Sequence, residues 1–185
     1  IQRSIMNLDK ETGISIMRIN ENLDEGPVCN QYSLKISEEM NSEELSENLS
    51  LIASEKILDI LDNIDDGNVE FKDQDHSKAT YAKKIQKTEG KIDWNENAEK
   101  IIGKINGLYP YPGAFFSFNG ERYKILKAEK SSTTGKPGYI ASENFEVCCG
   151  EGSIKVLSIQ REGKRVQQIN EFLLGTQIKK GTNIA

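Results

Sequence analysis

The second half of the chain contains a succession of short apolar segments separated by strong turn signals, and this pattern restricts the fold more than any other feature. Strands are expected at residues 114–118, 121–128, 138–141, 145–149 and 153–160. Asn119-Gly120 is a hairpin signal, and glycine-containing turns follow at residues 134–137 and 150–152. Short strands at this spacing, followed by a helix at residues 168–174, predict a small β-barrel.

A helix is expected just before these strands, at residues 98–108, where Ile101, Ile102 and Ile105 fall on one face. Pro110 and Pro112 stop it. The tyrosines beside these prolines are expected to pack the corner between helix and barrel, because aromatic side chains bury large areas. Stacking against nucleic-acid bases is the alternative for the same tyrosines.

The first half has a different pattern. A short helix is expected at residues 1–8, and strands at residues 14–20 and 28–36. Ser42 can cap a long helix that ends at residues 65–68. Its apolar stripe consists of Leu45, Leu49, Ile52, Ala53, Ile57, Ile60, Leu61 and Ile64. An amphipathic helix of this kind needs a sheet to pack on.

A polar stretch separates the two halves. Residues 71–86 have no sustained periodicity and are interpreted as a linker, within which His76 is expected to be exposed to solvent. The sequence thus predicts three regions: residues 1–70, the linker at 71–86, and residues 87–185.

Charge also divides the chain. The net charge is −5, but residues 1–90 carry 10 Lys and Arg against 19 Asp and Glu, whereas residues 91–185 carry 14 against 10. A basic second half indicates a phosphate-rich partner, with ordinary lysine-rich solubility as the alternative. No apolar run approaches the roughly 18 residues that span a bilayer, so no membrane contact is expected and the cytoplasm is the expected compartment.

The three cysteines, Cys29, Cys148 and Cys149, have no zinc-ligand spacing, and one histidine adds nothing to a metal site. They are expected to be reduced structural thiols, and no metal is expected.

One acidic loop stands out in the first half. Residues 20–25 connect the two expected strands and carry Asp24. A carboxylate at a turn between strands is a plausible catalytic or ligand-binding group. Aspartate is also common in turns for a purely local reason, because its side chain bonds the neighbouring backbone.

Several segments together resemble the folate-dependent formyltransferase family. They lie at residues 1–5, 11–14, 23–26, 92–94, 109–114, 159–165 and 171–175. Their order and spacing cover nearly the whole chain. The resemblance implies an α/β protein in which the C-terminal fragment of a Rossmann-like formyltransferase domain is followed by a small OB-like β-barrel domain.

The resemblance also implies a reaction: transfer of a formyl group from 10-formyltetrahydrofolate to the amino group of methionyl-initiator-tRNA. Asp24 matches a catalytic Asp that holds a histidine charged and assists proton removal. Glu21, Asn22, Leu23 and Glu25 match the loop that binds folate, where Glu25 replaces the usual threonine. The family's catalytic Asn and His precede the first motif matched here. We therefore expect this chain to be inactive alone and to need the N-terminal half of the catalytic domain as a partner.

The barrel is expected to contact tRNA phosphates through basic side chains. The candidates are Lys104, Arg122, Lys124, Lys127, Arg161, Lys164 and Arg165. Taken alone, each is interpreted as a solvated surface charge; the tRNA contact is expected of the set on a small barrel. The family usually has an arginine where this chain has Asn106, which removes one possible tRNA or interdomain contact.

Two other functions remain open from the sequence. A sugar-nucleotide N-formyltransferase would share the Asp24 loop and the chemistry but not the acceptor. A non-catalytic nucleic-acid-binding barrel with an N-terminal appendage would use only the second half. The basic segment at residues 161–165 favours a tRNA acceptor over the sugar nucleotide, and the match across the Asp24 loop argues against a purely binding role.

Overall fold

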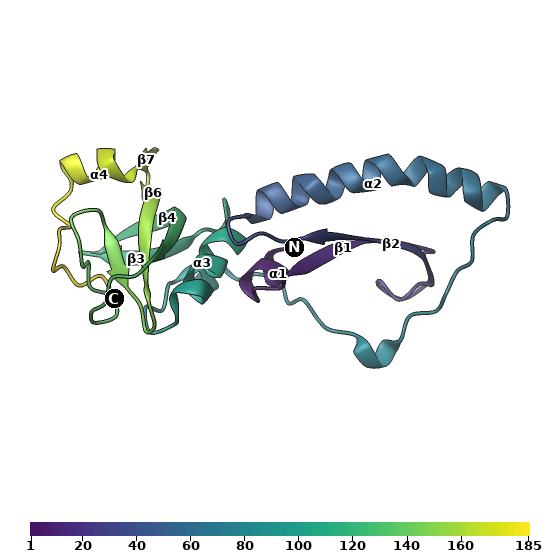
Figure 1. Ribbon diagram of the computed structural model, residues 1–185, viewed down its shortest axis with the longest axis horizontal. Helices are drawn as coiled ribbons and strands as arrows, with labels where there is room; N and C mark the ends of the chain where they lie inside the picture. The colour runs from purple at the N-terminus through teal and green to yellow at the C-terminus, as the bar shows by residue number, and fades with distance from the viewer. The chain divides into compact units, whose positions relative to one another are not determined.

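The computed structural model describes all 185 residues, which form two compact units (Figure 1). The barrel unit consists of residues 1–9, 38–43 and 85–185, and the ribbon unit of residues 10–37 and 44–84. These units do not follow the chain in sequence order, because two short segments from the first half group with the barrel. The predicted division into residues 1–70, 71–86 and 87–185 remains a prediction about domains.

The barrel unit is built on a curled antiparallel sheet of five strands. The strands are β3 (Ala114–Phe118), β4 (Glu121–Ser131), β5 (Glu146–Cys148), β6 (Ser153–Arg161) and β7 (Val166–Gln168). Their order is β3-β4-β6-β5, with β7 added on β6. The strand expected at residues 138–141 is wrong: Tyr139 and Ile140 form only isolated bridges. The fifth strand is β7, which the sequence did not predict.

Three α-helices and a 3-10 turn belong to the same unit. They are α1 (Gln2–Met6), η2 (Lys87–Gly90), α3 (Ala98–Gly107) and α4 (Ile169–Gly175). Asn97 begins α3 by accepting a hydrogen bond from the Lys100 N–H at 2.8 Å. A Cβ at Gly107 would lie 2.6 Å from Met6 Cγ, so glycine at this position allows α1 to pack closely on α3.

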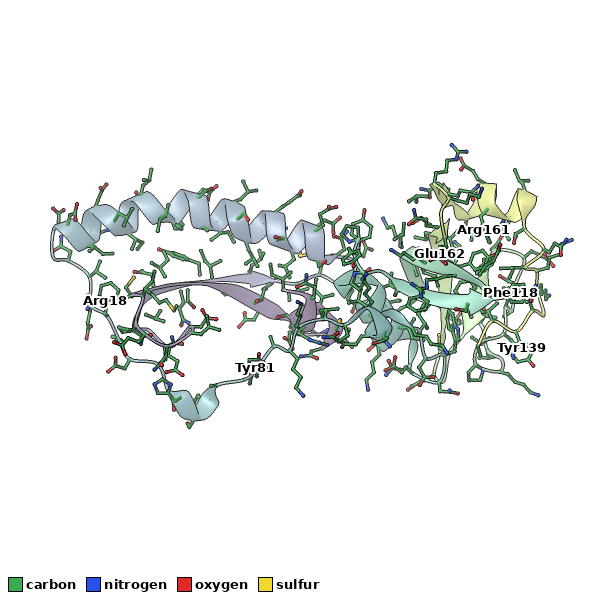
Figure 2. All side chains as sticks on the ribbon, turned by 180° about the vertical axis from the view of Figure 1, so that it is seen from behind. Arg18, Tyr81, Phe118, Tyr139, Arg161 and Glu162 are labelled. Atoms are coloured by element: carbon green, nitrogen blue, oxygen red, sulfur yellow. The ribbon has the colours of Figure 1, made fainter.

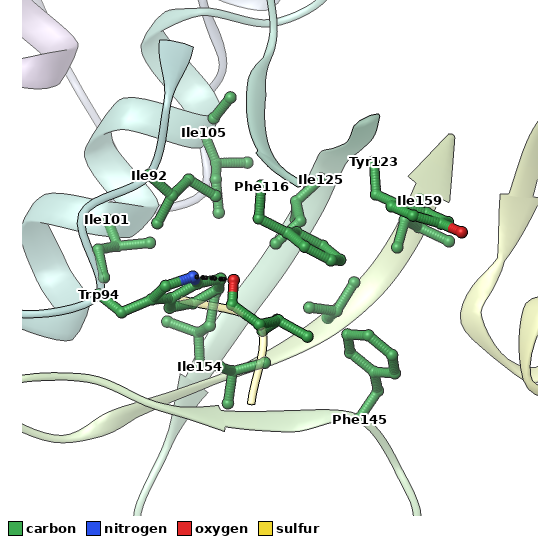
Figure 3. Packing of buried hydrophobic residues seen from close by; sticks show 14 of the residues in the cluster. Ile92, Trp94, Ile101, Ile105, Phe116, Tyr123, Ile125, Phe145, Ile154 and Ile159 are labelled. Carbon is green, nitrogen blue, oxygen red and sulfur yellow. Dashed lines mark hydrogen bonds between the residues drawn. The ribbon is translucent and has the colours of Figure 1, made fainter. Parts of the chain in front are cut away.

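A line of aromatic rings fills the concave side of the sheet (Figure 3). Phe116 stacks on Tyr123 with centroids 5.3 Å apart, and Phe172 meets the edges of Tyr123 and Phe145, each at 5.9 Å. Trp94 enters from the segment before α3, and its Nε1 donates to the Ile184 carbonyl at 3.2 Å. This bond joins the last residues of the chain to the core.

The ribbon unit contains two long strands and one long helix. Strands β1 (Glu11–Met17) and β2 (Val28–Lys35) pair antiparallel, with a register irregularity at Ile16 and Met17. Strand β1 ends three residues earlier than the expected 14–20, so the connecting loop is longer than predicted. Lys56 of the helix lies 5.9 Å from the Tyr32 ring of β2.

The long helix α2 spans Ser42–Asp65, as the sequence predicts. Its cap differs from the prediction, since Asn41 Oδ1 accepts the Glu43 N–H at 3.0 Å, while Ser42 Oγ donates to the Tyr109 carbonyl. Leu45, Leu49 and Ile60 are buried, as expected of the stripe. Ile57 and Leu61 are 38% and 49% exposed, so the apolar stripe is only partly covered.

One ion pair ties the start of the chain to the barrel unit. Arg3 donates two hydrogen bonds to the Glu89 carboxylate, at 2.7 and 3.1 Å. These bonds hold the pKa of Glu89 below its ordinary value. The folded pKa is therefore lower than the unfolded one. The pair stabilises the fold above the unfolded glutamate pKa of about 4.3, and this contribution is lost as the pH falls through the folded pKa.

We expect Glu89→Gln to lower the free energy of unfolding at pH 7 by at most about 1 kcal/mol, because the pair is partly solvated. The difference should shrink below about pH 4.3 and vanish once the pH is below the folded pKa, since the side chain at position 89 is then neutral in both proteins. Chemical denaturation across this pH range measures the effect. Glu143→Gln, which removes an exposed carboxylate outside any ion pair, is the control. A difference between wild type and Glu89→Gln that persists at low pH would contradict this account.

Candidate functional site

The loop between β1 and β2 holds the predicted catalytic residue and has a defined backbone. The Arg18 N–H donates to the Pro27 carbonyl at 2.9 Å and closes the loop at its base. Gly26 packs its α-carbon against the Arg18 carbonyl, where no side chain would fit. Within the loop, the Asn22 N–H donates to Asn20 Oδ1 at 3.1 Å. Asp24 has a φ of 58°, a left-handed conformation that aspartate tolerates better than most residues.

The side chains of this loop face solvent. Asp24 is exposed, and its carboxylate takes part in no hydrogen bond or ion pair of the structure. The four predicted folate-loop residues, Glu21, Asn22, Leu23 and Glu25, are exposed as well, and Leu23 is 85% exposed. The alternative in which Asp24 bonds its own turn is therefore not the arrangement found. A free carboxylate in a shaped loop can accept a hydrogen bond or a proton from a bound group.

A residue that the sequence did not single out holds this loop in place. Gln74 Nε2 donates to the Asp24 carbonyl at 2.9 Å and to the Gly26 carbonyl at 2.7 Å. Lys72 and Val28 exchange two backbone hydrogen bonds, at 2.8 and 2.9 Å, which align the segment beside β2. The Arg18 guanidinium lies 4.1 Å above the Phe71 ring. The start of the expected linker is thus an ordered support for the loop, followed by η1 (His76–Lys78).

Nothing in the sequence marks Gln74 for this role, because it lies in a polar run without periodicity. His76 is exposed, as predicted.

The seven basic candidates fall into two groups. Lys104 is 3.1 Å from Glu96, and Arg161 is paired with Glu121, which also accepts a hydrogen bond from Tyr123 at 2.7 Å. The other five are outside any ion pair of the structure: Arg122, Lys124, Lys127, Lys164 and Arg165. Arg161 is the last residue of β6, and its neighbour Glu162 follows it in the barrel unit (Figure 2).

The structure brings some of these candidates together. Arg122 and Lys124 are two residues apart on β4, so they lie on the same side of the sheet. Lys164 and Arg165 lie in the turn between β6 and β7. This turn adjoins Arg122, whose carbonyl accepts the Glu162 N–H at 2.9 Å. Lys104 lies on α3, outside this group.

Asn106, where the family usually has arginine, is a packing residue. It is 6% exposed, and its Nδ2 donates to the Glu38 carbonyl at 3.1 Å. This bond fixes residues 38–43 to α3 within the barrel unit. The position therefore contributes to the interior of the unit rather than to an exposed tRNA contact.

The two buried cysteines, Cys148 and Cys149, are poor nucleophiles. All three are free thiols, and burial raises the pKa of Cys149 to about 12 and also raises that of Cys148. No three His, Cys, Asp or Glu side chains are grouped so that they could hold a metal ion. None of the helices has the combination of length and apolar composition that a membrane-spanning segment requires.

Comparisons with known proteins identify the family. Residues 1–61 match the model of formyl transferases, and residues 84–177 match that of the formyl transferase C-terminal domain. This chain belongs to the formyl transferase family. A methionyl-tRNA formyltransferase from Pelagibacter ubique is 59% identical over all 185 residues, and one from Thermodesulfovibrio yellowstonii is 38% identical over 183. The chain spans about 60% of the length of these relatives.

Solved structures agree on the fold. A methionyl-tRNA formyltransferase from Clostridium thermocellum superposes with a TM-score of 0.57 at 23% identity, covering 73% of this chain and 57% of that one. HypX from Aquifex aeolicus, solved with tetrahydrofolic acid, gives 0.71 at 17% identity, covering 93% of this chain and 31% of that one. An N-formyltransferase from Helicobacter canadensis superposes with a TM-score of 0.68 at 19% identity. The superposition covers 89% of this chain and 58% of that one. The predicted α/β formyltransferase fold is confirmed.

The support that Gln74 gives to the loop can be tested directly. We expect Gln74→Leu to speed amide exchange at Arg18 roughly ten- to a hundredfold, because the loop then lacks two hydrogen bonds of about 0.5–1.5 kcal/mol each. Hydrogen exchange followed by NMR measures this. Gln31→Leu is the matched control, since Gln31 donates only to Ser15 across the ribbon. Equal exchange in wild type and Gln74→Leu would show that the loop does not depend on this residue.

Proposed function

We propose that this chain forms part of an enzyme that transfers a formyl group from 10-formyltetrahydrofolate to the amino group of methionyl-initiator-tRNA. The observation that carries the proposal is the 59% identity to a methionyl-tRNA formyltransferase along the entire chain. The sugar-nucleotide alternative has weaker support, since the Helicobacter canadensis N-formyltransferase is 19% identical. In a bacterial translation enzyme of this kind, the reaction takes place in the cytoplasm.

Asp24 is the residue of this chain that we assign to the chemistry. The amine of the methionyl group attacks the formyl carbon and forms a tetrahedral oxyanion. The carbon–nitrogen bond to folate then breaks: the attacking amine loses a proton, and the leaving nitrogen keeps the bonding electron pair and gains a proton, which gives tetrahydrofolate. The carboxylate of Asp24 is exposed and has no partner in the loop, so it is available to hold a cationic histidine or to accept that proton. The Asn and His of the family belong to the part of the relatives that this chain does not cover.

The same loop is our candidate for folate binding. Gln74 fixes the carbonyl groups of Asp24 and Gly26, so the loop backbone is ordered before a ligand arrives. Ordered backbone groups suit recognition of a flat pterin ring, which needs donors and acceptors at fixed positions. Glu21, Asn22, Leu23 and Glu25 surround this position, and Leu23 offers an apolar side chain.

The exposed basic side chains of the barrel unit are our candidates for the tRNA contacts. Phosphate contacts supply affinity but carry little sequence information. Arg122, Lys124, Lys127, Lys164 and Arg165 are free to pair with phosphates. Arg161 and Lys104 would first have to leave their carboxylate partners, so we expect them to contribute less.

The catalytic assignment predicts a specific kinetic result. In a protein that joins this chain to the uncovered part of the Pelagibacter ubique relative, Asp24→Asn should lower kcat by about 10²–10⁴-fold, the range typical of acid–base groups. KM for methionyl-tRNA should change little, because the carboxylate acts in the transition state. Steady-state formylation assays measure both constants.

Asp73→Asn is the matched control, since it makes the same substitution at an exposed carboxylate outside the proposed folate loop. Near-normal turnover in Asp24→Asn, with the fold intact, would refute the assignment. Formylation of a sugar nucleotide but not of methionyl-tRNA by the joined protein would instead replace the proposed acceptor.

The ion pairs in the structure indicate which basic residues should contribute most to tRNA binding. Converting Lys164 and Arg165 together to glutamine should weaken tRNA binding and reduce the salt slope by up to about two, roughly one for each phosphate that is no longer bound. Arg161→Gln should change the slope by less, because Glu121 already neutralises this side chain. Filter binding at several salt concentrations measures the salt slope of the double variant and of Arg161→Gln. If Arg161→Gln reduced the salt slope more than the double variant does, the ion pair between Arg161 and Glu121 would have to open when tRNA binds.

A further inference from the structure

The exposed tyrosine between the two prolines does not behave as the sequence predicts. Tyr111 is 63% exposed, so the expectation that it packs the corner between helix and barrel is wrong for this residue. Two cations approach its ring instead. Lys124 Nζ lies 5.8 Å and Lys87 Nζ 6.0 Å from the ring centroid. Both distances are within the range of cation–π attraction, so the ring is held in place while most of its surface stays open.

The neighbouring side of the sheet continues this arrangement. Phe115 of β3 is opposite Lys124 of β4, and Ser117 is opposite Arg122. Because Phe116 and Tyr123 point into the core, this second set faces the other side of the sheet, where Phe115 is buried and Arg122 is exposed. The Arg122 guanidinium covers the Phe115 ring at 4.2 Å. Tyr111, Lys87, Arg122 and Lys124 thus form one surface beside the buried Phe115 ring, and we name it the aromatic–basic face.

The charge of this face is not offset. Lys87, Arg122 and Lys124 lie near one another, and none of them forms an ion pair in the structure. Other cations of the barrel unit do have carboxylate partners: Lys130 is paired with Glu38 and Glu99, and Lys155 with Glu129. Like charges gathered without counter-charges repel each other, and an anionic ligand relieves that repulsion. Solubility alone would account for exposed cations on this face. It would not account for the position of two of them over the exposed ring of Tyr111.

The combination of groups selects one kind of ligand. An exposed aromatic ring offers a flat surface on which an unstacked base can lie, and adjacent cations bind the flanking phosphates. Bases inside a duplex are already stacked on their neighbours and cannot use such a ring. We propose that the aromatic–basic face binds a single-stranded segment of RNA, with one base stacked on Tyr111. The proposal rests on the proposed function, in which the acceptor is an RNA, and adds where and how this chain holds an unpaired nucleotide.

Fluorescence anisotropy with the 185-residue chain tests this. The probes are a labelled single-stranded oligoribonucleotide and a blunt RNA duplex of the same length. Tyr111→Ala should weaken single-strand binding about five- to 150-fold, the range found when a base-stacking aromatic is removed. Duplex binding should change much less. Tyr111→Phe keeps the ring and should bind nearly as wild type. Tyr81→Ala is the matched control, since Tyr81 is 83% exposed and has no cation against its ring.

The cations give an independent readout. Lys87→Gln and Lys124→Gln should each reduce the salt slope of single-strand binding by about 0.7, the value for one phosphate contact on a single strand. Tyr111→Ala should leave the slope unchanged, because stacking releases no counterions. Lys155→Gln, which removes a cation already paired with Glu129, is the control and should change neither slope nor affinity.

Three results would overturn the inference: unchanged single-strand affinity in Tyr111→Ala, equal losses of affinity in Tyr111→Phe and Tyr111→Ala, or equal losses for single strand and duplex. Absence of RNA binding by the folded wild-type chain would overturn it as well. The first three leave the proposed formyl transfer intact, since the Asp24→Asn assay tests that reaction with a different residue. Failure of the Asp24 assignment, in turn, would not change the result at Tyr111.

Discussion

The concave side of the curled sheet must be filled, and one line of aromatic rings fills it from Trp94 to Phe145 through Phe116, Tyr123 and Phe172. Side chains alternate along a strand, so placing Phe116 and Tyr123 in the core puts Phe115, Arg122 and Lys124 on the opposite side of the sheet. The Trp94 bond to the Ile184 carbonyl joins the end of the chain to the same core. The packing of the aromatic core therefore determines which basic side chains lie on the opposite side of the sheet.

The ribbon unit depends on a different kind of constraint. Its acidic loop has no apolar core of its own, and backbone hydrogen bonds define it instead. The bond from Arg18 to Pro27 closes the loop, and Gln74 holds two of its carbonyls. The carboxylate of Asp24 is left free, so the loop combines an ordered backbone with an available side chain. This combination is what a residue acting on a bound substrate requires.

Much of this architecture was predictable from the sequence, for physical reasons that also explain the misses. Strands β3, β4 and β6 and helices α2 and α3 have clear apolar periodicity and definite turns, and each was predicted. Strand β7 is three residues long and reads Val166-Gln167-Gln168, which has too little apolar content to signal a strand. In the candidate site, the loop and the family motif predict a role for Asp24, which stays a prediction. The role of Gln74, the pairing of Arg161 with Glu121 and the exposure of Tyr111 depend on residues distant in sequence, which local patterns do not encode.

We propose that RNA is held by cations without carboxylate partners that lie beside an exposed ring. Chemical-shift mapping of the isotope-labelled chain during titration with methionyl-initiator-tRNA tests it most directly, since every amide reports at once. We expect the largest shifts at residues 111–113 and 122–124, with smaller ones at 164–165. Shifts confined to the surroundings of the paired cations Lys104, Lys130 and Lys155 would contradict it.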